Sequence, residues 1–493
     1  MSRTKKAKGK LSIFSRLARN RDLIIIGIGM AIALGVFLKL TDLQRDTYWF
    51  EAVFFMPFIL YIIAIYWAYK TRSGADDLEK KVSKKEAMAR QKEVLYIILA
   101  FAIIFRAIFL FTTPTVSDDI YRFYWEGKVA AHGINPYQYA PDSVELEKFR
   151  DANWQFMNNR DVPSPYPPFS QMTFMYCYLM HPATDGIFLF KAFFTFFDMM
   201  SVYVLFQLLR NFKIDPRMSM VYAWSPLVIL EFSQSGHNDS VAIFFVLFSF
   251  LALQKGNKVG SAAALALGAL TKVFPLMLAP VMFKAWGKKG IAVFLVMMAI
   301  FYLPYIGAGQ AIFTGISEYT DRWLFNGSVF AAIVNILEST VIVSTRPEAM
   351  MVAKLVVAFL FAPVLAFLIY LSRKNWDRPL ELFKYAFVII GLFLLLTSTV
   401  QPWYIIWVMP FLCVFLMPSW ILLSGTAILS YIIYIRFDTK GIWDEALWVR
   451  LVEYLPFYAL LGIELAMSWM KTKDGLRSAR TKRPQSTVRG EEE

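Results

Sequence analysis

Two adjacent carboxylates, Asp118 and Asp119, stand where a long apolar stretch gives way to a polar one. Tyr121 and Trp125 follow them closely. A carboxylate at the mouth of an apolar cavity is suited to act as a general base, because its surroundings can tune its pKa. The pair also has a purely structural interpretation, since Ser117 is a good helix N-cap and acids are favoured in a first helical turn. Residue types alone leave both interpretations open.

A second polar group, Gly236-His237-Asn238-Asp239-Ser240, separates two apolar stretches. Such residues are ordinary in a tight turn. His237 is the unusual member, because the chain has only three histidines. Its ring could donate a hydrogen bond to a phosphate or to a hydroxyl group.

Cationic side chains that could stabilise a phosphate are also present. The candidates are Arg122, His237, Lys272 and Arg322. Lys272 lies deep in an apolar stretch, where a charge is costly and therefore indicates function by default. The alternative is that its ammonium group reaches the membrane interface. Arginine can bind an oxyanion through two parallel hydrogen bonds.

Aromatic and amide side chains near these residues suit the binding of sugars. The candidates for sugar or acceptor contacts are Tyr121, Trp125, Asn135, Tyr137, Tyr139, Tyr166, Asn238, Asp239, Asn326, Gln401, Trp403 and Tyr404. Several lie between prolines, which hold a loop extended. A rigid surface loop with aromatic anchors at the membrane interface would have the same composition.

The elements that must position these residues are membrane spans. Hydrophobic residues make up 57% of the 493 residues and charged residues 18%, and the mean hydropathy is +0.48. Apolar runs of span length exclude a soluble enzyme, a disordered chain and a fibrous protein. We expect twelve crossings at about 23–41, 49–69, 94–112, 186–209, 217–233, 239–254, 290–307, 350–372, 380–399, 402–417, 419–436 and 450–470.

The charge distribution predicts an orientation for these spans. Residues 1–22 hold eight Lys/Arg against one acid, and 70–93 hold another eight basic residues. Segment 113–168 instead has eight acids against five basic residues. The positive-inside rule therefore places both termini in the cytoplasm and the loops 113–168 and 308–349 outside, in a plasma (inner) membrane. The net charge of +14 is explained by cytoplasmic loops rather than by nucleic acid.

The domain organisation follows from these spans. We expect a basic cytoplasmic N-terminus at 1–22, a single transmembrane domain at 23–470 and a basic cytoplasmic tail at 471–493. Residues 168–182 are apolar but short, which favours an interfacial helix. Residues 259–284 have basic flanks at both ends. They form either two short helices broken near Lys272 that enter and return, or additional crossings that raise the count to fourteen.

Other kinds of site are not indicated. The two cysteines, Cys177 and Cys413, lie in apolar runs, so neither a disulfide framework nor a Cys-rich metal site is expected. The sequence has no Walker loop, dinucleotide glycine motif or zinc spacing. A divalent metal held by Asp118 and Asp119 is conceivable but not favoured, because adjacent side chains chelate poorly. No cofactor is therefore expected.

Five blocks occur in a characteristic order between about residues 90 and 420. They are SDDIYRFYWEGKVAAHGINPYQYAPDS, YPPFSQ, YAWSPLVILEFSQSGHNDS, LALGALTKVFPLMLAP and STVQPWYIIWVMPF. In this order they resemble membrane glycosyltransferases of the GT-C fold that use polyprenyl-phosphate sugars. The nearest similarity is to bacterial polyprenol-phosphate-mannose-dependent mannosyltransferases.

The resemblance implies an all-α bundle of about 12–14 transmembrane helices, with short interfacial helices in a long first outside loop. It implies a catalytic acid at the start of that loop, which matches Asp118 or Asp119, with the leading acid favoured as the base. It also implies inverting, metal-independent transfer of a hexose, mannose in particular. The donor would be a polyprenyl phosphate and the acceptor a glycolipid or glycan on the outer side of the membrane.

Two alternatives remain at this point. A transporter or flippase of lipid-linked sugars would also have broken helices and a buried lysine. Its charges would, however, lie near the midplane and its sequence would show internal repeats, whereas here the polar groups gather at one face. An oligosaccharide ligase of the same fold is the second alternative.

Overall fold

The computed structural model describes residues 20–40, 46–79, 84–340, 343–440 and 446–481. All regular elements in these ranges are helical, apart from isolated bridges that join Phe325 and Asn326 to Thr399. The predicted all-helical, polytopic class is therefore confirmed. Most of the predicted terminal segments 1–22 and 471–493 lies outside the described residues.

Nine helices in the described part of the chain are long and apolar enough to cross a membrane. They are Arg21–Lys39, Thr47–Thr71, Ala89–Leu110, Thr184–Asn211, Phe274–Arg322, Arg346–Lys374, Pro379–Leu396, Pro418–Ile435 and Leu447–Lys471. Three shorter apolar helices accompany them: Asp239–Gln254, Lys258–Ala269 and Val329–Glu338.

Two of the expected spans, 217–233 and 402–417, are not continuous helices. The first consists of η5 (Pro216–Ser219), α8 (Met220–Ala223), α9 (Pro226–Ile229) and the π-helical η6 (Leu230–Gln234). The second consists of η9 (Pro402–Trp407) and α17 (Met409–Leu412). Pro226 and Pro410 lack the backbone N–H that a continuous helix requires, so the helix is interrupted there and a new one begins.

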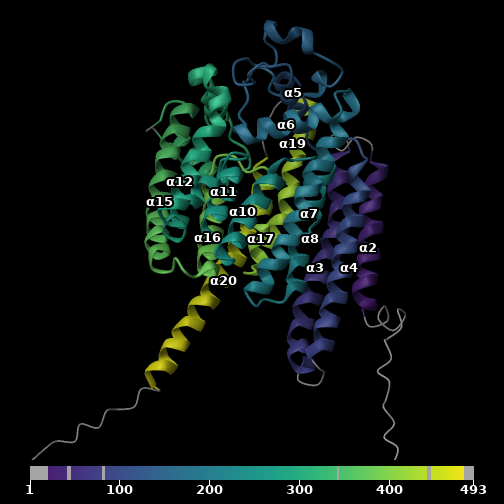
Figure 1. Cartoon of the computed structure of the whole chain (residues 1–493), viewed down its shortest axis with the longest axis vertical. Helices are drawn as coiled ribbons and strands as arrows, with labels where there is room; N and C mark the ends of the chain where they lie inside the picture. The colour runs from purple at the N-terminus through teal and green to yellow at the C-terminus, as the bar shows by residue number, and fades with distance from the viewer. Residues whose placement is uncertain (1–19, 41–45, 80–83, 341–342, 441–445, 482–493) are drawn as a thin grey trace, which may run out of the picture.

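The helices form one bundle with two unlike ends (Figure 1). Helices α2 (Arg21–Val36), α3 (Thr47–Glu79) and α4 (Lys84–Leu110) lie side by side at one edge, and α12 (Ala279–Tyr302) and α15 (Arg346–Lys374) lie at the opposite edge. Helices α5 (Asp119–Ala131) and α6 (Pro168–Met180) lie together across one end, which we name the α5 end. The remaining longer helices are α7 (Ile187–Asn211), α10 (Asp239–Gln254), α11 (Lys258–Ala269), α13 (Thr314–Arg322), α14 (Val329–Glu338), α16 (Pro379–Leu396), α18 (Pro418–Thr426), α19 (Ile433–Lys440) and α20 (Leu447–Thr481).

Segment 259–284 enters the bundle and returns to the end from which it started. At the α5 end, the carbonyl of Leu270 accepts a hydrogen bond from the Phe169 backbone N–H of α6 (2.9 Å). The chain then turns back, and the Trp286 indole N–H donates to Ser261 Oγ near the start of α11 (2.9 Å). The expected break near Lys272 is thus present, and it lies at the α5 end.

Helix α5 is fixed to the bundle by an aromatic core beneath it. Phe123 of α5 stacks on Phe174 of α6, with ring centroids 4.6 Å apart, and contacts Phe194 of α7 edge-on. All three rings are fully buried. Aromatic pairs of this kind add stability beyond the area that they bury. This packing therefore fixes the position of the first turn of α5.

Candidate active site

Asp118 and Asp119 lie at the N-terminus of α5, but the Asp118 carboxylate does not cap the helix. Asp118 occupies the N-cap position and makes no side-chain capping bond. Ser117, the expected cap, lies one residue too early, although its Oγ accepts from the Asp119 backbone N–H (3.3 Å). Asp118 Oδ1 accepts instead from the side-chain amide of Asn158. Helix capping therefore does not explain why a carboxylate occupies position 118.

The surroundings of Asp118 raise its pKa to about 7. Burial is the largest cause, because it penalises the charged form, and the neighbouring Asp119 carboxylate adds to it. The hydrogen bond from Asn158 and the charge of His237 act in the opposite direction. A carboxylate with a pKa near neutrality is matched to the task of taking a proton at physiological pH.

His237 is fully buried between two carboxylates. Its Nε2 lies 3.6 Å from Asp119 Oδ2, and its Nδ1 lies 3.1 Å from Glu231 Oε2. The imidazole stacks on Trp403, with ring centroids 3.9 Å apart. Burial on its own would lower the pKa of His237, but the hydrogen bond and charge of Glu231, together with Asp119, raise it above the ordinary value. The arrangement favours an imidazolium beside Asp119.

The local backbone explains how Glu231 and His237 come together. Glu231 belongs to the π-helical η6, and π-helical turns often occur at functional sites. Gly236 follows with φ of +75°, and a Cβ there would lie 2.6 Å from Ile120 Cδ1 of α5. Only glycine fits this left-handed and crowded turn. The Tyr431 hydroxyl donates to Glu231 Oε1 (2.8 Å), which fixes the carboxylate.

Asp239 and Lys272 form a second charged pair in the same region. Lys272 Nζ lies 3.1 Å from Asp239 Oδ2, and the Trp407 indole N–H donates to Asp239 Oδ1 (2.8 Å). The ammonium also lies 5.1 Å from the centroid of the Tyr166 ring. Asp239 is completely buried, whereas 13% of the Lys272 side chain is exposed. Lys272 is therefore the member of the pair that a ligand can reach.

Amide and phenol groups tie the surrounding loops together. The Asn238 amide donates to Ser170 Oγ (2.9 Å), and the Asn135 amide donates to the Tyr305 carbonyl (3.0 Å). The Tyr137 hydroxyl donates to the carbonyl of Tyr166 (2.6 Å). These contacts bring α6, α10 and the loop after α5 to one place.

Comparison with known proteins assigns this arrangement to a family. A family model described as alpha-(1->6)-mannopyranosyltransferase, N-terminal domain, matches residues 38–288. The matched part is about half of the chain and includes Asp118, Glu231, His237 and Lys272. The chain belongs to this family. No match is found among curated proteins.

The family assignment confirms the expected resemblance to GT-C mannosyltransferases that depend on polyprenyl-phosphate-mannose. The protein is therefore a membrane hexosyltransferase. Trp403 and Tyr431, which contact His237 and Glu231, lie beyond the matched residues.

Arg122 and Arg322 of the mannosyltransferase are already engaged with other groups. Arg122 pairs with Glu126 (Nε–Oε1, 2.6 Å) and donates to the carbonyls of Asn159 and Val162, so it braces the loop after α5. Arg322 is half exposed. Its guanidinium pairs with Asp161 (2.8 Å) and Glu318 (2.5 Å). A phosphate would have to displace these partners.

The other predicted contact residues occupy varied places. Trp125 is buried in the core beneath α5, and Tyr139 packs against the edge of that core. Tyr121 packs on Phe156, with ring centroids 5.2 Å apart. Asn326 donates to Glu453 of α20 (2.8 Å).

The segment 401–404 lies next to the site. Gln401 precedes η9 and is half-buried. Tyr404 shares a hydrogen bond with the Tyr319 hydroxyl (2.7 Å) and stacks on Trp407. Trp403 thus reaches His237 from the same short segment that supplies Tyr404 and Trp407.

Sequence reasoning missed Glu231 and Asn158. Glu231 carries the signal that singled out Lys272, since it is a lone charge in an apolar stretch. Asn158 is an ordinary loop residue that only the fold brings to Asp118.

Among the residues that the structure describes, no group of three His, Cys, Asp or Glu side chains is arranged to hold a metal ion.

Proposed function

We propose that the protein transfers mannose from a polyprenyl phosphate to a glycolipid or glycan acceptor at the α5 end, with inversion and with Asp118 as general base. The observation that carries the proposal is the Asp118 carboxylate, whose pKa is raised to about 7 at the start of α5 and which is not used as a helix cap. Membership of the alpha-(1->6)-mannopyranosyltransferase family supports mannose as the transferred sugar and an α-(1→6) bond as the linkage.

In this reaction a hydroxyl oxygen of the acceptor attacks the anomeric carbon of the donor mannose. The bond from that carbon to the phosphate oxygen breaks as the new glycosidic bond forms. The hydroxyl proton passes to Asp118, and polyprenyl phosphate leaves with the bonding electrons. Because phosphate is a good leaving group, a single base suffices, whereas hydrolysis of a glycoside needs two opposed carboxylates. An α-(1→6) linkage would use a 6-hydroxyl group of the acceptor.

His237 and Glu231 support the base through the charge of the imidazole. The His237 ring, whose Nε2 faces Asp119, has a charge that lowers the pKa of Asp118 against the effect of burial. Glu231 holds the ring through Nδ1. We therefore assign His237 and Glu231 positioning roles rather than direct contacts with the donor.

Lys272 is the cation that we assign to the donor phosphate. It is partly exposed at the α5 end, and its paired Asp239 and the Tyr166 ring hold it in place. A fixed cation stabilises the negative charge that develops on a leaving phosphate. The lipid chain of the donor would reach this position sideways from the bilayer.

We infer that the α5 end faces the outer side of the plasma membrane and that both termini are cytoplasmic. The basic segment 70–93 and the lysines at 255–258 and 284–289 support this orientation through the positive-inside rule. The acidic excess of 113–168, which contains α5, agrees with it.

Purified protein in lipid vesicles tests the proposal. Labelled polyprenyl-phosphate-mannose is supplied with extracted membrane glycolipids, and the product linkage is determined. We expect an α-(1→6)-mannosylated product without any ion gradient. Movement of the labelled donor across the bilayer without a new glycosidic bond would instead support a flippase. Transfer of whole oligosaccharides in preference to mannose would support a ligase.

A further inference from the structure

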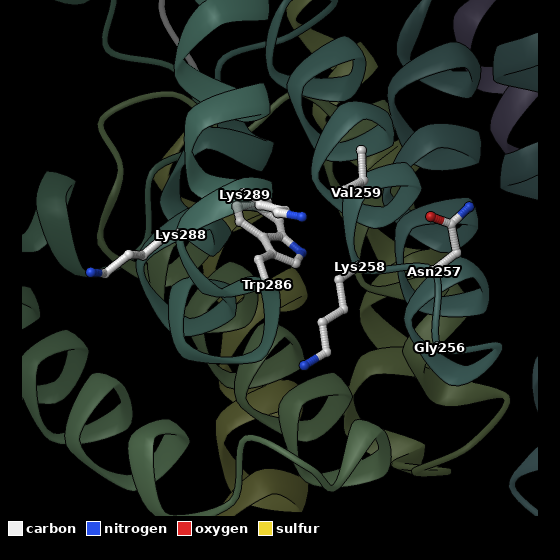
Figure 2. A pocket seen from close by; sticks show the side chains of 7 residues that line it. All are labelled: Gly256, Asn257, Lys258, Val259, Trp286, Lys288 and Lys289. Atoms are coloured by element: carbon white, nitrogen blue, oxygen red, sulfur yellow. The ribbon is translucent and has the colours of Figure 1, made fainter.

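A basic pocket lies at the end of the bundle opposite the α5 end. Its lining residues come from the start of α11 and from the middle of α12, and are Gly256, Asn257, Lys258, Val259, Trp286, Lys288 and Lys289. The pocket has a volume of about 430 Å³. This is large enough for a phosphate-bearing headgroup. In Figure 2 the Lys289 side chain runs across Trp286 in the view and the Lys258 side chain extends below it, whereas the Lys288 side chain extends away to the left.

Two helix starts meet at this pocket. Helix α11 begins at Lys258, and the Asn257 side chain caps it by accepting from the Gly260 backbone N–H (2.8 Å). Helix α12 is interrupted at Gly287, where φ is +66°, and resumes at Lys288. Nothing crowds the position of a Cβ at Gly287, so glycine is favoured there by the backbone conformation alone. Because the ends of α10 (Gln254) and of the first part of α12 (Trp286) lie here too and carry the opposite partial charge, the positive charge of the pocket comes from its lysines.

The positive charges of the pocket have no acidic counterparts. Among the described residues, no carboxylate lies within ion-pair distance of Lys258, Lys288 or Lys289. No Asp or Glu lines the pocket. Such a site favours an anion, because no carboxylate in the described part of the chain neutralises its lysines.

The surroundings favour an anion that belongs to a lipid. Trp286 lies in the pocket wall, and Lys258 Nζ lies 5.0 Å from the centroid of the Trp376 ring. Tryptophan next to lysine is typical of the headgroup level of a membrane. The part of α12 that follows the pocket exposes Leu295, Val296 and Ile300, each by more than half, and these side chains offer an apolar track for an acyl chain.

We propose that this pocket binds the phosphate headgroup of an anionic membrane lipid, with Lys258 and Lys289 as the ligands of the phosphate. The site is separate from the transferase site and does not depend on the reaction assigned to it. Basic pockets between transmembrane helices are known to select anionic headgroups. Lys288 is assigned no direct contact, because its side chain points away.

The test uses the full-length protein in neutral detergent and native mass spectrometry with phosphatidylglycerol as the probe. The pocket variant is Lys258→Gln combined with Lys289→Gln. The matched control is Lys213→Gln combined with Lys384→Gln, which removes the same charge from two exposed lysines outside the pocket. We expect the pocket variant to bind the probe about tenfold more weakly or worse, and the control to bind it as the wild type does.

Further arms separate the possible sources of phosphate. Inorganic phosphate in millimolar excess should not displace the bound lipid. Full displacement would assign the pocket to a soluble phosphate and overturn the lipid proposal. Equal weakening in both double variants would show binding to diffuse surface charge, and unchanged binding in the pocket variant would show that the pocket is not the site. Either result overturns the proposal.

Discussion

The two ends of the bundle carry ionisable groups in opposite ways. At the α5 end, His237, Glu231 and Asp239 are fully buried, and each faces an oppositely charged side chain. At the other end, Lys258 and Lys289 are exposed and lie beyond ion-pair distance of the described carboxylates. A buried charge needs a partner because its desolvation is costly, whereas an interfacial lysine can remain solvated. The α5 end is therefore a preorganised site, whereas the lysines at the other end remain solvated and can bind an anion.

Apart from removal of the base Asp118 itself, the largest effect that we predict concerns Glu231. Glu231→Gln keeps the side-chain shape but removes the charge that holds the His237 imidazolium. Because a hydrogen bond to a charged group contributes about 1.5–3 kcal/mol, we expect kcat/KM to fall about 10- to 100-fold. Rates measured with purified protein and labelled donor test this. Glu464→Gln, which alters a carboxylate bonded to Ser419 in another part of the bundle, is the control and should stay within about twofold. Equal losses in both variants would indicate a general packing effect.

Lys272 and Arg322 should differ although both are candidate phosphate ligands. Lys272→Gln should lower kcat/KM for the donor about tenfold, with a fall in kcat, because the charge that stabilises the leaving phosphate is lost. Arg322→Gln should change it less than about twofold, since exposed ion pairs contribute little. Steady-state kinetics with varied donor concentration measure both. A larger effect of Arg322→Gln than of Lys272→Gln would instead place the donor phosphate near Arg322, at the end of α13.

Two substitutions should shift the pH dependence in opposite directions. The base must be ionised, so the wild-type rate should rise with pH through about 7 and then level off. The Asp119 carboxylate raises the pKa of Asp118, so Asp119→Asn should move this rise to lower pH. The Asn158 hydrogen bond lowers that pKa, so Asn158→Ala should move the rise to higher pH. Profiles of kcat/KM that shift in the same direction in both variants would exclude Asp118 as the titrating group.

The smallest effect should come from the basic pocket. In neutral detergent, Lys258→Gln combined with Lys289→Gln should leave mannosyl transfer within about twofold of the wild-type rate, because the pocket lies at the other end of the bundle. Transfer assays in detergent without anionic lipid measure this. A loss above about tenfold under these conditions would mean that the two ends are coupled.

The sequence predicted the parts of the site that depend on unusual residue types. Asp118, His237 and Lys272 are conspicuous because polar groups are scarce beside apolar runs, and the structure places them at one end of the bundle. Glu231 carries the same signal, because it too is a lone charge in an apolar stretch. The break near Lys272 could be predicted from residues 259–284. Their basic flanks place both ends of this apolar stretch on the same side of the membrane, so the chain has to turn back within it.

Other features depend on tertiary contacts that no local pattern encodes. Nothing in the sequence shows that Arg122 braces the loop at Asn159, or that Asn158 donates to Asp118, since these residues are more than thirty positions apart. The expected span 217–233 was wrong as a continuous helix, because hydropathy measures composition and does not register how Pro226 interrupts the hydrogen bonds.

The rate of mannosyl transfer by Asp118→Asn tests the central claim most directly. The variant keeps the size of the side chain and can still accept the Asn158 hydrogen bond, but it cannot take a proton. Single-turnover rates with labelled polyprenyl-phosphate-mannose would be compared for the wild type, Asp118→Asn and Asp119→Asn, with donor binding measured separately. We expect Asp118→Asn to lose about 10²- to 10⁴-fold in rate with donor binding retained, and Asp119→Asn to lose much less. A wild-type rate in Asp118→Asn would contradict the assignment of Asp118 as the base.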